Sequence, residues 1–417
     1  MGSFEEPKAQ ELRTSATDTK SLKTQSNPKK PWIETPLIES KPLSRAAGCR
    51  IFLKLENLQP SGSFKSRAMG SLILHHLTNP ANHGKHPHFF IPSGGNAGLA
   101  AVTAARALSY PCTVVLPTYI PQGMVQRLKD AGAIVVAYGD DIEASAKYMR
   151  EVLMEEVRGV VDEETGREVV PVELHPYDHP AAWEGNSTLV EEVGRQMPVE
   201  DGRGSGFPVD GIVCSVGGGG LMNGVVLGVE RELQHTRSST CPTTNKNNHQ
   251  VNGYAHAPSQ NENENEEKTV HILALETRGA DALAQAVQQK SLVSLPRITS
   301  LATSLGAVRV AERTLLNVLE PPRGVEVHNF VMDDGEAARG VLRLLDEHRL
   351  LVELACGVCV EAVVAGGLKS KLARVVPGFG PESRVVVVVC GGSNVSLEMA
   401  GEYRERVGKG WEAESVS

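Results

Sequence analysis

The chain has 417 residues, of which 41% are hydrophobic and 22% charged, so it is long enough to form two globular domains. A formal net charge of -8 argues against the basic surface that nucleic-acid binding requires. No apolar run approaches the roughly 20 residues that span a bilayer. We therefore expect neither a nucleic-acid nor a membrane partner.

The N-terminal segment, residues 1–31, is polar, mixed in charge and poor in apolar side chains, which predicts a disordered leader. A mitochondrial transit peptide is the weaker alternative, because acidic residues such as Glu5 and Glu11 dilute its positive charge. The seven cysteines are scattered through apolar segments, which indicates free thiols in a reducing compartment. We therefore expect a cytoplasmic protein.

From residue 50 onward, short apolar and β-branched runs alternate with longer segments of helical spacing. Strands are predicted at Arg50–Leu55, His88–Ile91, Thr113–Leu116, Ile134–Ala137, Gly211–Ser215, Ile272–Glu276 and Arg384–Cys390. Helices are predicted at Gly98–Ser109, Pro121–Ala131, Asp141–Val157 and Ala181–Met197. This alternation predicts an α/β fold with mainly parallel sheets. Residues 235–268 are rich in Asn, Gln, Glu, Ser and Thr, so we expect a disordered insertion there.

Lys65 lies among small residues in the segment Ser61–Arg67, which we interpret as a tight turn. A lysine amine is a poor nucleophile when it is protonated in water, and a strong one when it is desolvated. Taken alone, this segment fits a solvated surface lysine better. Three further small-residue loops favour a functional site instead: Pro92–Gly98, Ser215–Leu221 and Val389–Asn394.

Together, these four segments resemble the fold-type-II pyridoxal-phosphate (PLP) enzymes, and most closely the L-serine/L-threonine dehydratases. The resemblance extends from about Thr35 to Leu397. It implies an α/β fold like that of the tryptophan synthase β subunit, with two open parallel-sheet domains and the smaller one inserted in the larger. The large domain would comprise residues 32–57 and 180–417, and the small domain residues 58–179. It also implies a homodimer.

The resemblance makes Lys65 the catalytic residue, which holds PLP covalently, and places Phe64 beside the cofactor. The phosphate group of PLP is expected to bind the loop of four glycines, Gly217, Gly218, Gly219 and Gly220. These glycines expose backbone amides before the helical stretch Leu221–Val229, and both the amides and the helix N-terminus attract an anion. A flexible turn is one alternative. A dinucleotide site is another, but the loop lacks the final glycine of G-x-G-x-x-G.

The loop around Asn96 is expected to contact both the cofactor and the substrate. Asn96 would hydrogen-bond the ring hydroxyl of PLP, and the substrate carboxylate would bind Ser93, Gly94, Asn96 and Ala97. A structural turn is the alternative. Threonine deaminases of the biosynthetic kind and serine racemases usually have histidine after this asparagine, so Ala97 favours the serine dehydratases. Because Gly94 has no side chain, we expect it to leave space for the methyl group of threonine.

Cys390 follows a run of five valines, and the simplest interpretation is a buried small hydrophobic residue. The resemblance places it opposite the pyridine nitrogen of PLP. A thiol is neutral and a weak donor, so this nitrogen would stay largely unprotonated. That favours prompt elimination over racemisation or transamination.

The family counterpart of Glu276 binds a monovalent cation together with backbone carbonyls. Those carbonyls correspond here to Gly217, Ala280, Leu305 and Ala307. Hard oxygen donors suit such an ion, and we expect K⁺. An ordinary carboxylate at a strand end is the alternative interpretation of Glu276.

Two other patterns are interpreted as structural. The pair Cys356 and Cys359 has no second cysteine pair at zinc spacing, and the prolines around His175 and His179 mark a connector. The resemblance thus implies a PLP-dependent ammonia-lyase that converts L-serine to pyruvate and ammonia, and also L-threonine to 2-oxobutanoate. The alternatives are a serine racemase or a β-replacement synthase of the same fold, and a PLP-binding protein without catalysis.

Overall fold

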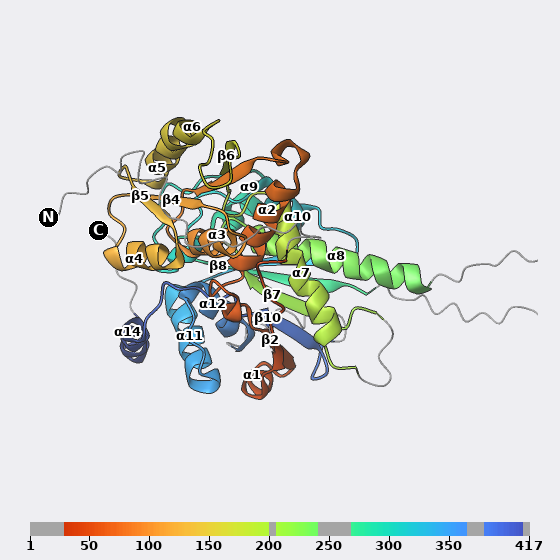
Figure 1. Cartoon of the computed structure of the whole chain (residues 1–417). Helices are drawn as coiled ribbons and strands as arrows, with labels where there is room; N and C mark the ends of the chain where they lie inside the picture. The colour runs from red at the N-terminus through yellow and green to blue at the C-terminus, as the bar shows by residue number, and fades with distance from the viewer. Residues whose placement is uncertain (1–28, 200–205, 241–267, 365–378, 412–417) are drawn as a thin grey trace, which may run out of the picture.

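The computed structural model describes residues 29–199, 206–240, 268–364 and 379–411. Within these residues, ten strands form two sheets, and helices pack on both (Figure 1). None of the described helices is long and apolar enough to span a membrane. Most of the predicted leader lies outside the described residues, but its last residue, Pro31, is buried against Gly70. The leader therefore ends earlier than we predicted, because Pro31 packs on the core.

The larger sheet has six strands in the order β1-β2-β10-β7-β8-β9. Its strands are β1 (Leu37–Glu39), β2 (Arg50–Lys54), β10 (Arg384–Val388), β7 (Gly211–Ser215), β8 (Val270–Thr277) and β9 (Val325–Met332). All neighbouring strands are parallel except β1, which is antiparallel to β2. The predicted α/β architecture is confirmed. Strands β1 and β9 were not predicted, and β10 ends two residues before Cys390.

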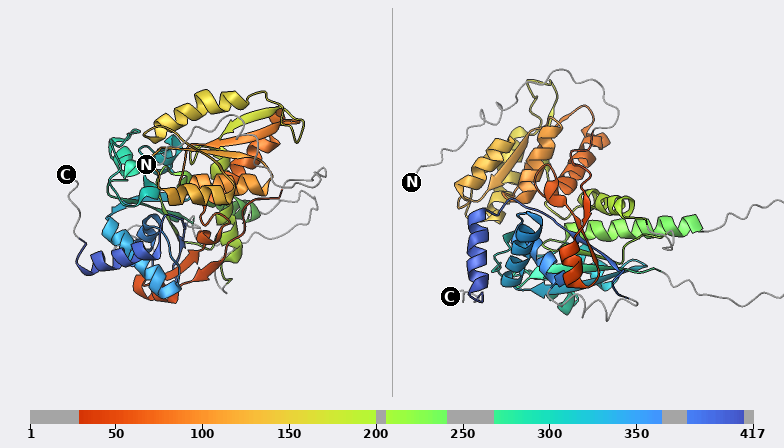
Figure 2. Two further views of the ribbon diagram at one scale, coloured as in Figure 1. Left: turned by 60° about the vertical axis from the view of Figure 1, so that its left-hand side comes forward. Right: turned by 90° about the horizontal axis from the view of Figure 1, so that it is seen from below.

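The smaller sheet is fully parallel, in the order β5-β4-β3-β6. Its strands are β5 (Ile134–Ala137), β4 (Cys112–Leu116), β3 (His86–Ile91) and β6 (Val169–Glu173). All four lie within residues 58–179, the range predicted for the small domain. The domain boundaries themselves stay a prediction. The right-hand view of Figure 2 shows the segment around this sheet, in orange and yellow, above the larger sheet.

Helices cover both sheets (Figures 1 and 2). They are α1 (Lys41–Ala47), α2 (Lys65–Thr78), α3 (Asn96–Ala107), α4 (Gln122–Ala131), α5 (Ile142–Tyr148), α6 (Met154–Val157), α7 (Pro180–Gln196), α8 (Gly220–Thr240), α9 (Ala282–Gln289), α10 (Glu312–Leu319), α11 (Asp334–His348), α12 (Leu354–Val364) and α14 (Leu397–Gly408). Most residues of helix α12 are buried. It packs closely against α11 at Gly340 and Gly357, since a Cβ on Gly340 would collide with the backbone of Gly357.

Helix α8 shows that the predicted insertion begins too early. Its buried face carries Val225, Val229 and Leu233, and the helix continues to Thr240. The hydroxyl of Thr236 donates to the carbonyl of Glu232 at 3.0 Å, a bond that helical threonines commonly make. Polar composition therefore did not prevent residues 235–240 from extending a helix that begins on the core. Residues 241–267 lie outside the described part of the chain.

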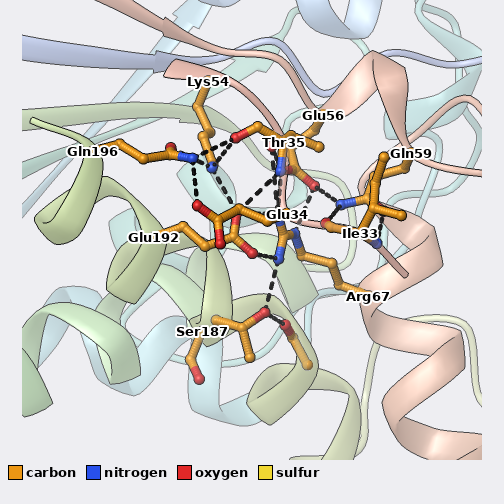
Figure 3. Close-up of polar contacts among 12 residues, drawn as sticks. Ile33, Glu34, Thr35, Lys54, Glu56, Gln59, Arg67, Ser187, Glu192 and Gln196 are labelled. Atoms are coloured by element: carbon orange, nitrogen blue, oxygen red, sulfur yellow. Dashed lines mark hydrogen bonds and ion pairs between the residues drawn. The ribbon is translucent and has the colours of Figure 1, made fainter. Parts of the chain in front are cut away.

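A buried ion network joins α2 to α7 and to the segment after β2 (Figure 3). The guanidinium of Arg67 donates to the carboxylate of Glu56 at 2.8 and 2.7 Å and to that of Glu192 at 2.6 and 2.7 Å. The ammonium of Lys54 donates to the same Glu192 carboxylate at 2.6 Å. The side chains of Arg67, Glu56 and Lys54 are fully buried. Two cations thus balance two anions out of contact with water.

Each charge in this network has a partner that compensates for its burial. Burial alone would raise the pKa of Glu192, but hydrogen bonds from Arg67 and Lys54 hold that pKa below its usual value. Lys54 also donates to the carbonyl of Thr35 at 2.7 Å. Because Arg67 lies two residues after Lys65, the network positions the start of α2 relative to the larger sheet.

We expect Arg67→Ala to lower the free energy of unfolding by about 3–5 kcal/mol, because it leaves two buried carboxylates with one cation. Chemical denaturation measures this loss. Arg158→Ala is the control, since its ion pair with Glu155 is exposed and its removal should not change the denaturation midpoint. Equal midpoints for Arg67→Ala and the unmodified chain would contradict the prediction.

Candidate active site

Lys65 is the first residue of α2, so it lies at a helix start rather than inside the predicted turn. Its ammonium donates to the carbonyl of Pro176 at 2.7 Å and lies 5.3 Å from the centre of the Phe64 ring. Burial lowers the pKa of Lys65 to about 8. Solvated lysines have a pKa near 10.4. Near pH 7.5, the neutral fraction of the Lys65 amine is therefore far larger than that of a solvated lysine.

Backbone contacts bring Cys390 next to this lysine. The amide of Phe64 donates to the carbonyl of Cys390 at 3.1 Å, and Ser63 forms an isolated bridge with Gly391. The Cys390 thiol is buried and lies 3.8 Å from the hydroxyl of Ser215. A hydrogen bond with Cys356, together with burial, raises the pKa of Cys390, so its thiol is neutral.

Gly217, Gly218 and Gly219 lie between β7 and α8, Gly220 is the first residue of α8, and all four are closely surrounded. A Cβ on Gly217 would lie 3.1 Å from the Cα of Leu305, and one on Gly218 would collide with the ring of Tyr177. Gly219 has a φ of +94°, and a Cβ there would collide with the side chain of Thr314. Within the described chain, no acceptor takes a hydrogen bond from the amides of Gly217, Gly218 or Gly219. The loop therefore presents free amide donors at the start of a long helix, as an anion site requires.

This loop and Lys65 are joined through one connector. Tyr177, which covers Gly218, follows the residue whose carbonyl accepts from Lys65. Tyr177 also donates through its hydroxyl to the carbonyl of Arg309 at 3.2 Å. The predicted lysine and the predicted phosphate loop thus meet at the segment Pro176–Tyr177, which sequence reasoning treated only as a connector.

Asn96 is the first residue of α3 and links the smaller sheet to loops of the larger one. Its amide donates to the carboxylate of Glu353 at 2.9 Å and to the hydroxyl of Ser304 at 3.3 Å. Its carbonyl accepts from the amide and hydroxyl of Ser393 at 2.9 and 3.1 Å. Ser93 lies in the loop before α3 and Ala97 is the second residue of that helix, whose N-terminus favours a negative charge.

The expectation that Gly94 leaves space for a threonine methyl is wrong. A Cβ on Gly94 would lie 2.7 Å from Cδ2 of Leu116, a buried residue of β4. The position of a Cβ on Gly94 therefore points toward the core of the smaller sheet. Its role as a carboxylate ligand through its amide stays a prediction.

Glu276 lies near the end of β8 and is fully buried. Its carboxylate accepts from the amides of Leu283 and Ala284, both at 2.8 Å, and from the side chain of Asn329 at 3.0 Å. These amides begin α9, so Glu276 caps that helix. Burial raises the pKa of Glu276 to about 7, although the three hydrogen bonds act in the opposite direction.

Of the carbonyls predicted to join Glu276, Gly217 and Leu305 lie beside each other, as the contact of their backbones shows. The carbonyl of Leu305 accepts from the amide of Ala307 at 2.7 Å, so these two residues form one turn. Ala280 forms a bridge with Thr277, next to Glu276. These residues therefore lie in two groups: Gly217 and Ala307 near Leu305, and Ala280 near Glu276.

Sequence reasoning missed several polar residues at the site. Glu353 is 5% exposed and accepts from the amide of Asn394 at 2.7 Å as well as from Asn96. Three buried polar atoms near the Lys65 turn have no hydrogen-bond partner among the described residues: Ser63 Oγ, Asn57 Oδ1 and Asn394 Oδ1. Buried polar atoms without partners are rare, so these atoms indicate a polar ligand.

The two patterns interpreted as structural have ordinary packing and capping contacts, and the absence of a metal or redox role stays a prediction. Cys356 and Cys359 are buried in α12 and belong to no disulfide. His175 accepts from the amide of Asp178 at 2.8 Å, and His179 caps α7 by accepting from Ala181 at 3.0 Å.

Comparisons with known proteins agree with this arrangement. The profile of the family described as "Pyridoxal-phosphate dependent enzyme" matches residues 29–391. "Serine dehydratase-like" of Rattus norvegicus is 36% identical over 375 residues, which are 89% of this chain and 94% of the relative. "L-serine dehydratase/L-threonine deaminase" of Mus musculus is 33% identical over 383 residues, which are 90% and 96% of the two chains. A solved fungal L-serine ammonia-lyase from Rhizomucor miehei has a TM-score of 0.69 and 28% identity, covering 91% of this chain and 100% of that one.

The close packing of the glycine loop gives a stability prediction. Gly219→Ala should lower the melting temperature and weaken anion binding, because it introduces both a collision with Thr314 and a strained positive φ. Differential scanning fluorimetry with and without inorganic phosphate measures both effects. Gly123→Ala is the matched control, since no atom lies within 4 Å of a Cβ there. If the two variants melt alike, the loop is not the constrained structure described.

Proposed function

The chain belongs to the family of pyridoxal-phosphate-dependent enzymes, and we propose that it is an ammonia-lyase acting on L-serine and L-threonine. The names of its relatives and of its structural neighbour support this reaction, at 28–36% identity over most of each chain. The observation that carries the proposal is the amine of Lys65, whose pKa is lowered by burial. The residues just before Lys65 contact the Cys390 loop, and its hydrogen-bond partner Pro176 precedes the residue that covers the glycine loop. The homodimer and the cytoplasmic location stay predictions.

The residues around Lys65 fit PLP. Free amides in the glycine loop suit its phosphate, and unpaired buried atoms such as Ser63 Oγ suit its polar groups. The residues that we propose to hold the cofactor are Lys65 and Phe64, Gly217, Gly218, Gly219 and Gly220, Asn96 and Cys390. When bound, PLP supplies the electron sink that makes the Cα proton of an amino acid acidic.

The chain's own residues would then perform the proton transfer and the positioning. The amine of Lys65 acts as general base toward the Cα proton, and its lowered pKa makes the neutral amine available near neutral pH. The carbonyl of Pro176 holds that amine in place. The substrate carboxylate binds Ser93, Gly94, Asn96 and Ala97 at the N-terminus of α3. The 3-hydroxyl group takes up a proton and leaves as water, and the proton that Lys65 removes from Cα balances this step. Water then hydrolyses the product to a keto acid and ammonia.

Cys390 favours elimination over racemisation. Burial and its contact with Cys356 keep this thiol neutral. A neutral partner does not stabilise a proton on the ring nitrogen of the cofactor, so negative charge at Cα has to leave promptly with the hydroxyl group. The alternative of a racemase requires that charge to persist until a proton returns to Cα. A β-replacement enzyme begins with the same elimination, so Cys390 does not distinguish it from an ammonia-lyase.

We further propose that K⁺ binds near Glu276 with the carbonyls of Gly217, Ala280, Leu305 and Ala307. Support comes from the buried carboxylate and from the neighbouring backbones of Gly217 and Leu305. Oxygen donors of this kind suit a hard cation.

The function is tested by incubating the purified full-length chain and PLP with L-serine labelled with deuterium at Cα. We expect pyruvate, ammonia and loss of the deuterium, with no D-serine. Lys65→Ala should abolish turnover and the visible absorbance of the bound cofactor, whereas the exposed Lys129→Ala should retain both. Substantial pyruvate formation by Lys65→Ala would rule out the role of Lys65, and D-serine as the main product would favour a racemase.

The cation proposal predicts faster turnover in K⁺ than in Na⁺ or tetramethylammonium. Because the pKa of Glu276 is raised to about 7, protons compete with the cation below that pH. Activation by K⁺ should therefore grow as the pH rises through about 7, and Glu276→Gln should need more K⁺ or lose the dependence. Steady-state rates from pH 6 to pH 8.5 measure this. Equal rates in K⁺ and tetramethylammonium at every pH would dispose of the cation site.

A further inference from the structure

Three potential metal ligands lie on the edge strand β9 of the larger sheet and on its neighbour β8. His271 on β8 is paired in register with Glu326 on β9, and His328 follows Glu326 by two residues. Paired residues, and residues two apart on a strand, share one face of a sheet. All three side chains therefore lie on the same face. They lie near the N-terminal ends of these parallel strands, whereas Glu276 lies near the carboxyl end of β8.

The ligand atoms of this cluster form a small triangle. Nδ1 of His271 lies 3.1 Å from Nε2 of His328 and 3.4 Å from Oε2 of Glu326, and the third side of the triangle, between His328 and Glu326, is 3.6 Å. A tetrahedral zinc ion with bonds of about 2.0–2.1 Å separates its ligand atoms by about 3.3 Å. The observed spacing thus matches three corners of such a tetrahedron. Within the described residues, this is the one group of three His, Cys, Asp or Glu side chains with ligand atoms this close.

Hydrogen bonds alone do not account for all three contacts. A proton between His271 and His328 satisfies one side of the triangle. The imidazole nitrogen that accepts this proton then faces the Glu326 carboxylate with a lone pair, so at least one side brings two acceptors together. A cation at the centre faces all three atoms at once. The nearby carboxylate of Asp210 is already engaged, because it accepts from Lys268 at 3.1 Å and from the amide of Arg384 at 2.8 Å. It therefore does not complete the site.

We propose that His271, Glu326 and His328 bind one Zn²⁺ ion, with water as the fourth ligand. Two imidazole nitrogens and one carboxylate oxygen are a donor set that zinc uses in proteins. The His271 side chain is 3% exposed and that of Glu326 is 53% exposed, so the cluster has a buried side and a side open to solvent water. The ion connects the edge strand β9 to β8. Because it lies at the end of the strands opposite the carboxyl ends, its role is structural, and it does not depend on the proposed reaction.

The test uses the full-length protein with PLP, freed of metal by dialysis against a chelator. Isothermal titration with Zn²⁺ should show one saturable site per chain, and Co²⁺ in its place should give the intense visible absorption of four-coordinate cobalt. His328→Gln should weaken Zn²⁺ binding at least tenfold, because second-shell changes alone weaken metal sites 10–100-fold. His83→Gln is the matched control, since His83 is an exposed histidine distant in sequence from this cluster.

Glu326→Gln is a second variant, which should fold even if His328→Gln does not, because the Glu326 side chain is largely exposed. Zn²⁺ should raise the melting temperature of the unmodified chain and of His83→Gln, but not that of Glu326→Gln. Keto-acid formation from serine should be the same in all of them. Equal Zn²⁺ affinity in the unmodified chain, His328→Gln and Glu326→Gln would overturn the proposal, whatever the outcome of the serine assay.

Discussion

The buried ion network around Arg67 is the constraint on which the arrangement of the site depends. It places two cations and two carboxylates where water does not reach, and such groups are tolerated only when each charge meets a partner at close range. Arg67 satisfies Glu56 and Glu192 at once, and these belong to segments far apart in the chain. The first turn of α2 is therefore held between them, and Lys65, one half-turn earlier, is held with it.

The active site forms where loops from both sheets meet. Asn96, at the start of the helix that follows β3 of the smaller sheet, contacts Ser393 in the loop after β10 of the larger sheet and Glu353 just before α12. Both sheets present the ends of parallel strands and the starts of helices to this region, so backbone amides and helix dipoles point into it. Loops after strands therefore supply both the amide donors and the polar side chains.

Sequence alone predicted most of the strands, the α/β class and the loops that meet at Lys65, because each depends on a local pattern of apolar and small residues. It did not predict strands β1, β6 and β9. In the edge strand β9, the polar residues Glu326, His328 and Asn329 interrupt the apolar pattern. Nor did it predict the hydrogen bonds of Glu353 or the capping of α9 by Glu276, because these partners lie on different elements. It was wrong about the surroundings of Gly94, since the neighbour that fills that space, Leu116, comes from another strand.

The glycine loop also restricts how this sequence can evolve. Its glycines are enclosed by three neighbours: Gly218 and Gly220 by Tyr177, Gly219 by Thr314, and Gly217 by the backbone of Leu305. A smaller side chain in place of Tyr177 or Thr314 would relieve one collision and leave the others. No substitution elsewhere removes a backbone atom. A mutation at Gly218 or Gly219 would therefore require a compensating change at Tyr177 or Thr314, whereas Gly217 and Gly220 face backbone atoms that no such change removes.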